Sequence, residues 1–225
     1  METSLHRQLK LLYGGSTGEV EVQVGGYRID AVVKGRLIEI QQASLGALRD
    51  KVRSLLQSHR VVVVKPLIAS KHLIRRDKAD GEIVSARNSP IHETVYNLFE
   101  DLVHFVNVFP HPRLTLEVVL TRQEEHRITC VRRRRRGPDY RVQDRKLIEV
   151  ISTVRLKTAA DLRKLLPVDL PASFTTGELA QRGGIPRWLA QKMAYCLRKT
   201  GAIDICGKQG NAQLYCAKRK SRPAA

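Results

Sequence analysis

Alternating apolar and polar residues between positions 19 and 41 predict three short antiparallel strands near the start of the chain. Valine alternates with acidic and amide residues over 19–24, and a similar alternation runs through 27–33 and 37–41. Gly25-Gly26 and Lys34-Gly35 separate the three segments, and such pairs favour two-residue hairpin turns. Side chains of a strand point alternately to opposite faces, so the aliphatic set is expected to face the core.

Apolar residues at helical spacing predict a helix on either side of this meander. The first covers residues 2–13 and the second residues 44–58. The β-branched run at 60–67 follows, and it is typical of a strand buried on both faces of a parallel or mixed sheet. A helix over 91–108 and a strand over 114–121 complete the pattern. We therefore expect an α/β sandwich with a mixed sheet, forming a first domain over residues 1–125.

The pattern of the C-terminal part is different. Helices are expected over 145–156 and 159–166, and Thr175 with Glu178 fits a capping box that begins another helix. Gly183-Gly184 predicts a turn, and Pro186 suits the first turn of a helix that ends near Thr200. Strands at 202–206 and 213–217 enclose a Gly-rich loop. This arrangement resembles a small winged helix-turn-helix domain over residues 141–225, with an Arg-rich linker at 126–140.

Charge separates the two parts of the chain. The net charge is +18, and residues 126–225 carry 23 basic and 7 acidic side chains against 17 and 15 in residues 1–125. A charge of one sign gathered in one half predicts a polyanionic partner, of which nucleic acid is the first candidate. A basic surface without a specific ligand is the simpler alternative.

Acidic residues of the meander fall opposite one another if its turns are two-residue loops. Val33 then pairs with Arg36, so Asp30 lies opposite Glu39, and Glu21 lies opposite Asp30 by the same counting. Directly opposed like charges destabilise a sheet unless something compensates them. Mg²⁺ or Mn²⁺ would do so, because hard cations take oxygen ligands. Acids on a solvent face without a role are the alternative.

The run Arg28-Ile29-Asp30, eight further residues and Glu39-Ile40-Gln41 resembles the core motif of the PD-(D/E)XK nuclease superfamily. That core has the order helix, three-stranded meander, helix, strand, and the resemblance covers roughly residues 2–67. Ile29 stands where proline is frequent, and Gln41 stands where the family has lysine, although some active restriction endonucleases of the family have glutamine there. The resemblance implies a restriction-endonuclease-like α/β/α sandwich.

The resemblance also implies roles for individual residues. Asp30 and Glu39 would bind Mg²⁺ or Mn²⁺ together with the backbone carbonyl of Ile40, and Gln41 would orient the attacking water or touch the scissile phosphate. The metal would lower the pKa of that water. The first helix often donates an acid in this family, which makes Glu2 the candidate and His6 its alternative. Lys10 or Lys65 could supply the charge of the missing lysine.

DNA contacts are expected from two basic segments. In the winged helix, the helix over 186–200 would enter the major groove, with Leu189, Met193 and Leu197 on its core face, which Trp188 could join. The arginine run is either a solvated linker or a segment that grips phosphates. The expected nucleic-acid-binding residues are Arg132, Arg133, Arg134, Arg135, Arg136, Arg187, Gln191, Lys192, Arg198, Lys199 and Lys208.

These patterns predict a metal-dependent DNA endonuclease anchored on duplex DNA by a basic winged helix. The alternative is a non-catalytic DNA-binding regulator or accessory protein with a degenerate nuclease fold. RNA binding is a third and weaker candidate, and the low aromatic content argues against base stacking. A homodimer would suit the cutting of both strands.

Compartment and redox state follow from what the sequence lacks. Nothing near the N-terminus resembles a secretory signal, and the longest aliphatic run, at 61–64, is far too short to span a membrane. The four cysteines contain no C-x-x-C pair, which is typical of reduced thiols. We therefore expect a cytoplasmic protein without a membrane partner, associated with the nucleoid if the source is bacterial.

Overall fold

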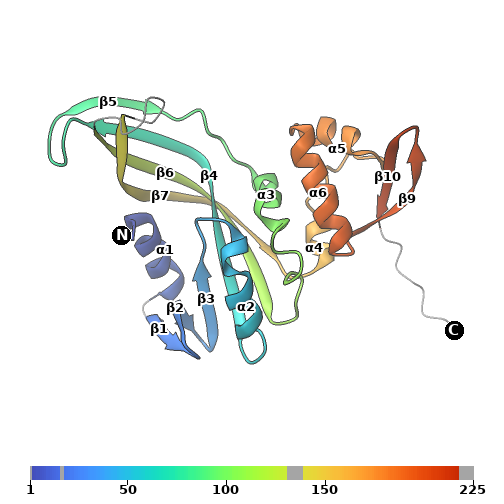
Figure 1. The fold of residues 1–225 in the computed structure, drawn as a ribbon, viewed down its shortest axis with the longest axis horizontal. Helices are drawn as coiled ribbons and strands as arrows, with labels where there is room; N and C mark the ends of the chain where they lie inside the picture. Colours follow the sequence, from blue (N-terminus) through green and yellow to red (C-terminus); the bar gives the residue numbers. More distant parts are fainter. Residues whose placement is uncertain (1, 16–17, 131–138, 218–225) are drawn as a thin grey trace.

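The computed structural model describes residues 2–15, 18–130 and 139–217, and these form an α/β fold with a large mixed sheet and a small sheet (Figure 1). The large sheet has the order β1-β2-β3-β4-β6-β7, and β5 pairs with β4. β3, β4 and β6 run parallel to one another, and the other pairings are antiparallel. Its strands are β1 (Glu19–Val24), β2 (Tyr27–Val33), β3 (Arg36–Ile40), β4 (Arg60–Arg76), β5 (Ile83–Asn88), β6 (Leu114–Thr129) and β7 (Tyr140–Leu156).

The register expected for the meander is confirmed at both turns, and the third strand covers Arg36–Ile40 where 37–41 was expected. Val33 pairs with Arg36 and Val24 with Tyr27, so both turns are two-residue loops. Lys34 and Gly35 have φ angles of 50° and 70°. Positive φ at both central positions is what a type I′ hairpin needs, and glycine adopts it without strain.

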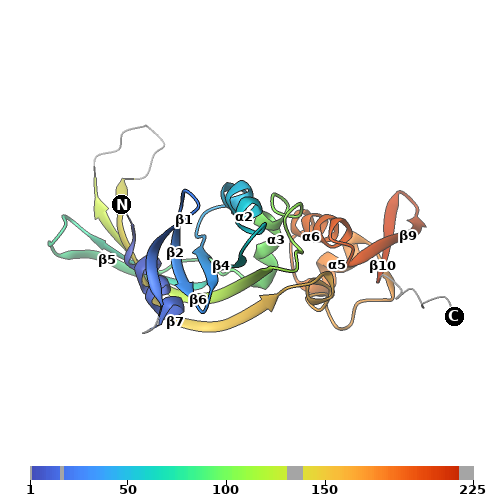
Figure 2. The ribbon, with the colours of Figure 1, turned by 90° about the horizontal axis from the view of Figure 1, so that it is seen from below.

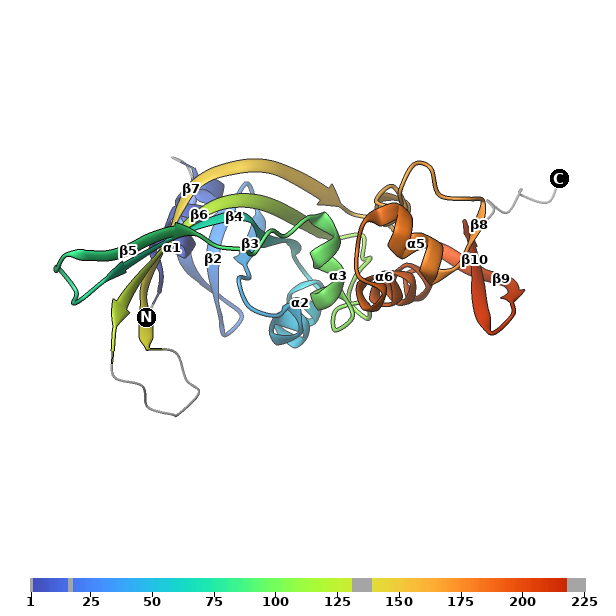
Figure 3. The same cartoon turned by 90° about the horizontal axis from the view of Figure 1, so that it is seen from above.

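Helices cover both faces of the large sheet. On one face, Leu5 and Leu9 of α1 (Ser4–Gly14) pack in a core cluster with Val62 and Val64 of β4. On the other face, Val61 and Val63 belong to the cluster of η1 (Leu45–Leu48), α2 (Arg49–Leu55) and α3 (Leu98–Leu102). Figure 3 shows α2 and α3 together on one side of the long strands. The continuous β-branched run therefore serves two cores at once.

Two long strands, β6 and β7, extend the large sheet beyond residue 125, where the first domain was expected to end. The sequence predicted a helix over 145–156, but these residues lie in β7, which pairs with β6 from Thr129 to Leu116. Three register shifts interrupt this pairing. Each bulge inserts a residue and reverses the inward–outward alternation, so the period of two that marks a strand is lost from the sequence. The expected linker over 126–140 thus overlaps the ends of a β-hairpin.

The helix expected over 91–108 is much shorter in the structure. It consists of the single turn η2 (Val95–Asn97) and α3, and turns continue to residue 108. Thr94 and Asn97 form a capping box that fixes the start of η2. Buried aromatics in the following turns, including Phe105 and Phe109, account for the apolar pattern without further helix.

The C-terminal unit has the order helix, strand, helix, helix, strand, strand. Its elements are α4 (Ala159–Arg163), β8 (Ser173–Phe174), α5 (Thr176–Gly183), α6 (Arg187–Lys199), β9 (Ile203–Gln209) and β10 (Ala212–Ala217). The strands form an antiparallel sheet in the order β8-β10-β9. The predicted capping box of Thr175 and Glu178 begins α5. Figure 2 shows this unit at one end of the long strands.

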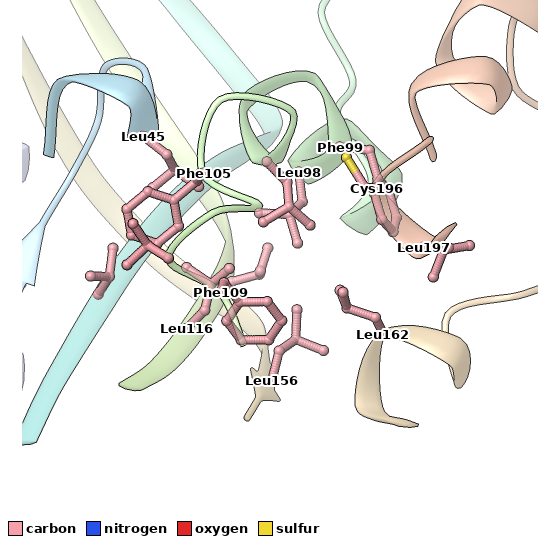
Figure 4. Packing of buried hydrophobic residues seen from close by; sticks show 14 of the residues in the cluster. Leu45, Leu98, Phe99, Phe105, Phe109, Leu116, Leu156, Leu162, Cys196 and Leu197 are labelled. Atoms are coloured by element: carbon pink, nitrogen blue, oxygen red, sulfur yellow. The ribbon is translucent and has the colours of Figure 1, made fainter. Parts of the chain in front are cut away.

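One hydrophobic cluster joins the two units. Phe99 of α3 lies beside Cys196 and Leu197 of α6, and all three are fully buried (Figure 4). Leu156 at the end of β7 and Leu162 of α4 belong to the same cluster. Because the apolar surface is continuous, the C-terminal unit is held against the sheet by packing and not only by its covalent connection.

Candidate functional site

An open cleft of about 430 Å³ lies beside the ends of β1 and β2, next to the first helix. Acidic and basic side chains alternate along its wall. The lining residues are Glu2, Thr3, His6, Lys10, Glu21, Arg28, Asp30 and Gln42. Three of the five residues expected in the catalytic site line this cleft, namely Glu2, His6 and Asp30.

Asp30 is held by donors from two elements. His6 Nε2 of α1 lies 3.0 Å from Asp30 Oδ1, and the backbone N–H of Ile40 donates to Asp30 Oδ2 at 2.8 Å. Burial alone would raise the pKa of Asp30, but these two hydrogen bonds outweigh it and the pKa is lowered. Asp30 is therefore ionised near neutral pH and fixed next to the β3 backbone.

Glu39 faces the side of the sheet that α2 covers. It pairs in register with Val63, whose side chain belongs to the cluster under α2, and only 3% of Glu39 is exposed. Lys51 Nζ of α2 lies 2.7 Å from Glu39 Oε1 as an ion pair, and no other described residue donates a hydrogen bond to Oε1. Burial raises the pKa of Glu39, and Lys51 only partly offsets this.

Asp30 and Glu39 thus lie on neighbouring strands but are held by different helices. The expected register is present, because Ala31 pairs with Ile38 and Asp30 bonds to Ile40. However, His6 draws Asp30 towards α1, and Lys51 pairs with Glu39 from α2. Glu39 does not line the cleft that contains Asp30. The two carboxylates therefore have different partners, yet they interact: burial is the main cause of the raised pKa of Glu39, and the nearby charge of Asp30 adds to it.

Glu21 and Lys10 extend the charged network of the cleft. Lys10 Nζ lies 2.5 Å from Glu2 Oε1 and 2.7 Å from Glu21 Oε1, and Arg28 also pairs with Glu21. Because β1 pairs through Val20 with Ala31 and Val22 with Ile29, Glu21 lies level with Asp30, as counted from the turns. Its φ of 59° bends the strand here. The negative charge of Glu21 is therefore compensated by Lys10 and Arg28.

Gln41 lies away from the cleft. Its side-chain amide donates to the carbonyl of Ser44 at 2.7 Å, so it braces the start of η1. Gln42 lines the cleft instead. Lys65 is adjacent, since Gln41 N donates to the carbonyl of Val64. Lys65 is buried and ion-paired at 2.6 Å with Asp101, so Lys10 is the lysine that faces Asp30's cleft.

The donor atoms present fit a hard divalent cation in chemistry. Asp30, Glu39 and the Ile40 carbonyl offer oxygen only, and Glu39 Oε1 is buried without a hydrogen bond from the described residues. No three His, Cys, Asp or Glu side chains of the described ranges gather as a metal-binding group. Mg²⁺ needs no such group, because it is commonly held by one or two carboxylates with water and phosphate oxygens.

Two ion-pair partners of this site were not singled out from the sequence. Lys51 is one of several basic residues on its helix, and Arg28 is part of the motif without an assigned role. Lys51 is recognisable once α2 is placed on the face of Glu39, where it also donates to the carbonyl of Arg28 at 2.6 Å. Nothing in the local sequence pattern indicates this contact, which depends on the tertiary placement of α2.

A basic face covers α6 in the C-terminal unit. Five of the eleven residues expected to contact DNA lie on this helix, four of them exposed and Lys192 half-buried, and Lys208 lies exposed where β9 approaches the turn to β10. Leu189, Met193 and Leu197 are buried as expected, whereas Trp188 is exposed and does not join them. The expected DNA-contact residues on α6 are Arg187, Gln191, Lys192, Arg198 and Lys199. Arg132, Arg133, Arg134, Arg135 and Arg136 lie outside the described residues.

No helix in the described ranges is both long and apolar enough to cross a membrane.

Comparison with known proteins places the large sheet within one family. A family model described as a domain of unknown function (DUF8091) matches residues 3–157, which contain all the strands from β1 to β7. An uncharacterized protein of Treponema pallidum (strain Nichols) is 31% identical over 224 residues, covering 99% of this chain and 86% of that protein. No solved structure matches. The chain therefore belongs to the DUF8091 family.

Proposed function

We propose that this protein is a metal-dependent DNA endonuclease with a PD-(D/E)XK-like N-terminal unit. The observation that carries the proposal is the 2.8 Å hydrogen bond from the Ile40 N–H to Asp30 Oδ2. It ties the acid of the second strand to the Glu39-Ile40 peptide of the third. The proposal needs the two acids close together, and this bond holds Asp30 beside the residue that follows Glu39.

The order of elements supports the same proposal. α1, the β1–β2–β3 meander, α2 and β4 follow one another as in the resembled core, and helices lie on both faces of a mixed sheet. His6 of the first helix reaches Asp30, in the role for which it was the alternative to Glu2. Glu2 reaches the same group of side chains through Lys10 and His6.

Asp30, Glu39 and the Ile40 carbonyl would hold Mg²⁺ or Mn²⁺. A bound ion supplies a more acidic water and neutralises charge that develops on the scissile phosphate. Asp30 is ionised and pre-positioned for this role, with His6 hydrogen-bonded beside it. Lys10 places a positive charge in the same cleft, where Gln41 supplies none.

The C-terminal unit would deliver DNA. Its order of helices and strands fits a winged helix, with α6 as the recognition helix and the β9–β10 turn as the wing. α6 carries four basic residues and no acidic one. Contacts between such side chains and phosphates release counterions, so binding should weaken steeply with salt.

The test is the conversion of supercoiled plasmid to nicked or linear DNA by the full chain in Mg²⁺ or Mn²⁺. We expect cleavage that chelation abolishes and that falls at least about a hundredfold in Asp30→Asn and Glu39→Gln, as for loss of charge-stabilising groups. Asp169→Asn is the matched control, because Asp169 is exposed on the far unit and pairs with Arg182. Equal activity in Asp30→Asn and wild type would disprove the assignment.

A non-catalytic DNA-binding protein is the second candidate. It is favoured by the Lys51–Glu39 ion pair and by the Gln41–Ser44 contact, since both draw motif residues away from the Asp30 cleft. This candidate predicts salt-sensitive DNA binding by a pure preparation that cleaves nothing in either metal. Binding that survives Asp30→Asn unchanged, without any cleavage by wild type, would favour it.

A further inference from the structure

Both exposed aromatic side chains of the described part of the chain lie on α6. Trp188 is 47% exposed and Tyr195 is 39% exposed, whereas the other aromatic side chains are buried or half-buried. The two are seven residues apart, which is close to two helical turns, so they share one face. The aromatic content is low at 5%, and the structure concentrates its exposed part at one place.

Lysines are interleaved with these rings. Lys192 Nζ lies 5.2 Å from the centroid of the Trp188 ring, and Lys199 Nζ lies 6.0 Å from that of Tyr195. We call these four residues the aromatic–lysine face. Rings provide stacking surfaces for bases of any sequence, and neighbouring cations neutralise the phosphates of the same strand. The combination is typical of surfaces that bind unpaired nucleotides.

The remaining surface of α6 makes this face rigid. Leu189, Met193 and Leu197 are buried in the core, and Phe99 of α3 packs beside Cys196 (Figure 4). A helix held from two sides presents its exposed rings without much loss of conformational freedom on binding. A preorganised surface of this kind loses less entropy when a ligand stacks on it.

We propose that the aromatic–lysine face binds unpaired DNA bases by stacking, so that the preferred substrate is a duplex with a single-stranded arm. In a continuous duplex the faces of the bases are covered by their neighbours, and a protein meets only their edges in the grooves. Trp188 and Tyr195 would gain little there. This inference rests on the proposed function and adds to it the DNA structure that is selected.

The chain contains a single tryptophan, so Trp188 reports on this contact directly. The full chain is titrated, without divalent metal, with a blunt duplex, the same duplex carrying a single-stranded arm, and the free DNA strand. We expect the arm to quench Trp188 fluorescence and to strengthen binding roughly tenfold over the blunt duplex, as for loss or gain of one stacked base. Equal affinity for the two duplexes overturns the proposal.

Variants of Tyr195 keep the test independent of the fluorophore. Tyr195→Leu should remove most of the preference for the armed duplex and leave blunt-duplex binding unchanged, whereas Tyr195→Phe should keep the preference because its ring remains. Lys192→Gln should weaken both DNAs alike and reduce the salt dependence. An equal loss on both DNAs in Tyr195→Leu would overturn the proposal, as would tighter binding of the matching RNA strand.

Failure of this inference and failure of the proposed function give different results. If wild type cleaves plasmid but binds both duplexes equally, the stacking proposal alone is wrong. If wild type prefers the armed duplex but never cleaves in Mg²⁺ or Mn²⁺, stacking is retained and the endonuclease assignment fails. If no DNA binds at all, both are rejected.

Discussion

At the scale of single residues, the site is a set of acids whose ionisation is set by their neighbours. Asp30 and Glu39 occupy adjacent strands, yet their pKa values move in opposite directions. Asp30 receives hydrogen bonds from His6 and Ile40, while Glu39 is buried with a single cation beside it. The ionisation of these acids therefore depends more on the side chains that reach them from the neighbouring helix than on their position in the sheet.

Asp30→Asn should lower the free energy of unfolding by about 1–3 kcal/mol near neutral pH, because charge-assisted hydrogen bonds are lost. The native pKa of Asp30 is lowered, so the stability it contributes is fully present above the unfolded pKa of about 4 and is lost as pH falls through the native value. Urea unfolding of wild type and Asp30→Asn, at pH 7 and below pH 4, measures the difference in their free energies of unfolding. A difference that grows towards acid pH would contradict the prediction.

Cys196 should be inert in the native protein. Burial raises the pKa of its thiol to about 12, so almost no reactive thiolate exists at neutral pH. Cys206 is exposed and should react first. Brief iodoacetamide treatment followed by peptide mass spectrometry should label Cys206 and leave Cys196 unlabelled until urea is added. The variant Cys206→Ser serves as the control, and native labelling of Cys196 would show that the α3–α6 contact is open.

At the scale of elements, the sequence predicted correctly those features that depend only on neighbouring residues, such as turns and helix caps. The Gly25-Gly26 and Lys34-Gly35 turns fixed the register of the meander, and the Thr175–Glu178 pair marked the start of α5. β7 was mistaken for a helix because its bulges break the period of two. β5 was not foreseen, since its exposed residues gain their order from pairing with β4.

Thr175→Ala should destabilise the C-terminal unit by about 0.5–2 kcal/mol, the usual cost of losing an N-cap side chain. The Thr175 hydroxyl accepts from the Glu178 N–H, and the variant loses this bond, whereas the bond from the backbone N–H of residue 175 to the Glu178 carboxylate, 2.7 Å in the native protein, can still form. Thr176→Ala is the matched control, because Thr176 begins the helix without capping it. Thermal unfolding followed by circular dichroism tests this, and equal shifts in the two variants would refute it.

At the scale of the whole molecule, two structural units share one hydrophobic cluster, and the change in charge at residue 126 does not coincide with the boundary between them. The boundary predicted near residue 125 falls inside the β6–β7 hairpin, whereas the sheet ends with Leu156. Sequence patterns could not show that α3 and α6 pack together, because that contact joins residues almost one hundred positions apart. The different helix partners of Asp30 and Glu39 have the same origin in tertiary packing.

The two units should unfold together. Fluorescence of Trp188 reports on the C-terminal unit, and far-ultraviolet circular dichroism reports on the whole chain, so their urea transitions should coincide. Phe99→Ala should lower the free energy of unfolding by about 3–5 kcal/mol and shift both signals, because Phe99 fills the junction. Two separated transitions, with only one of them shifted by the variant, would show independent domains.

The most direct test of the central claim is a titration of Mn²⁺ into the full chain, with free Mn²⁺ measured by electron paramagnetic resonance. We expect about one bound Mn²⁺ per chain in the presence of DNA, with affinity lost in Asp30→Asn and kept in Asp169→Asn, because Asp30 and Glu39 supply the oxygen ligands. Mn²⁺ binding that is unchanged by Asp30→Asn, or absent from wild type, would contradict a metal-dependent nuclease site at this position.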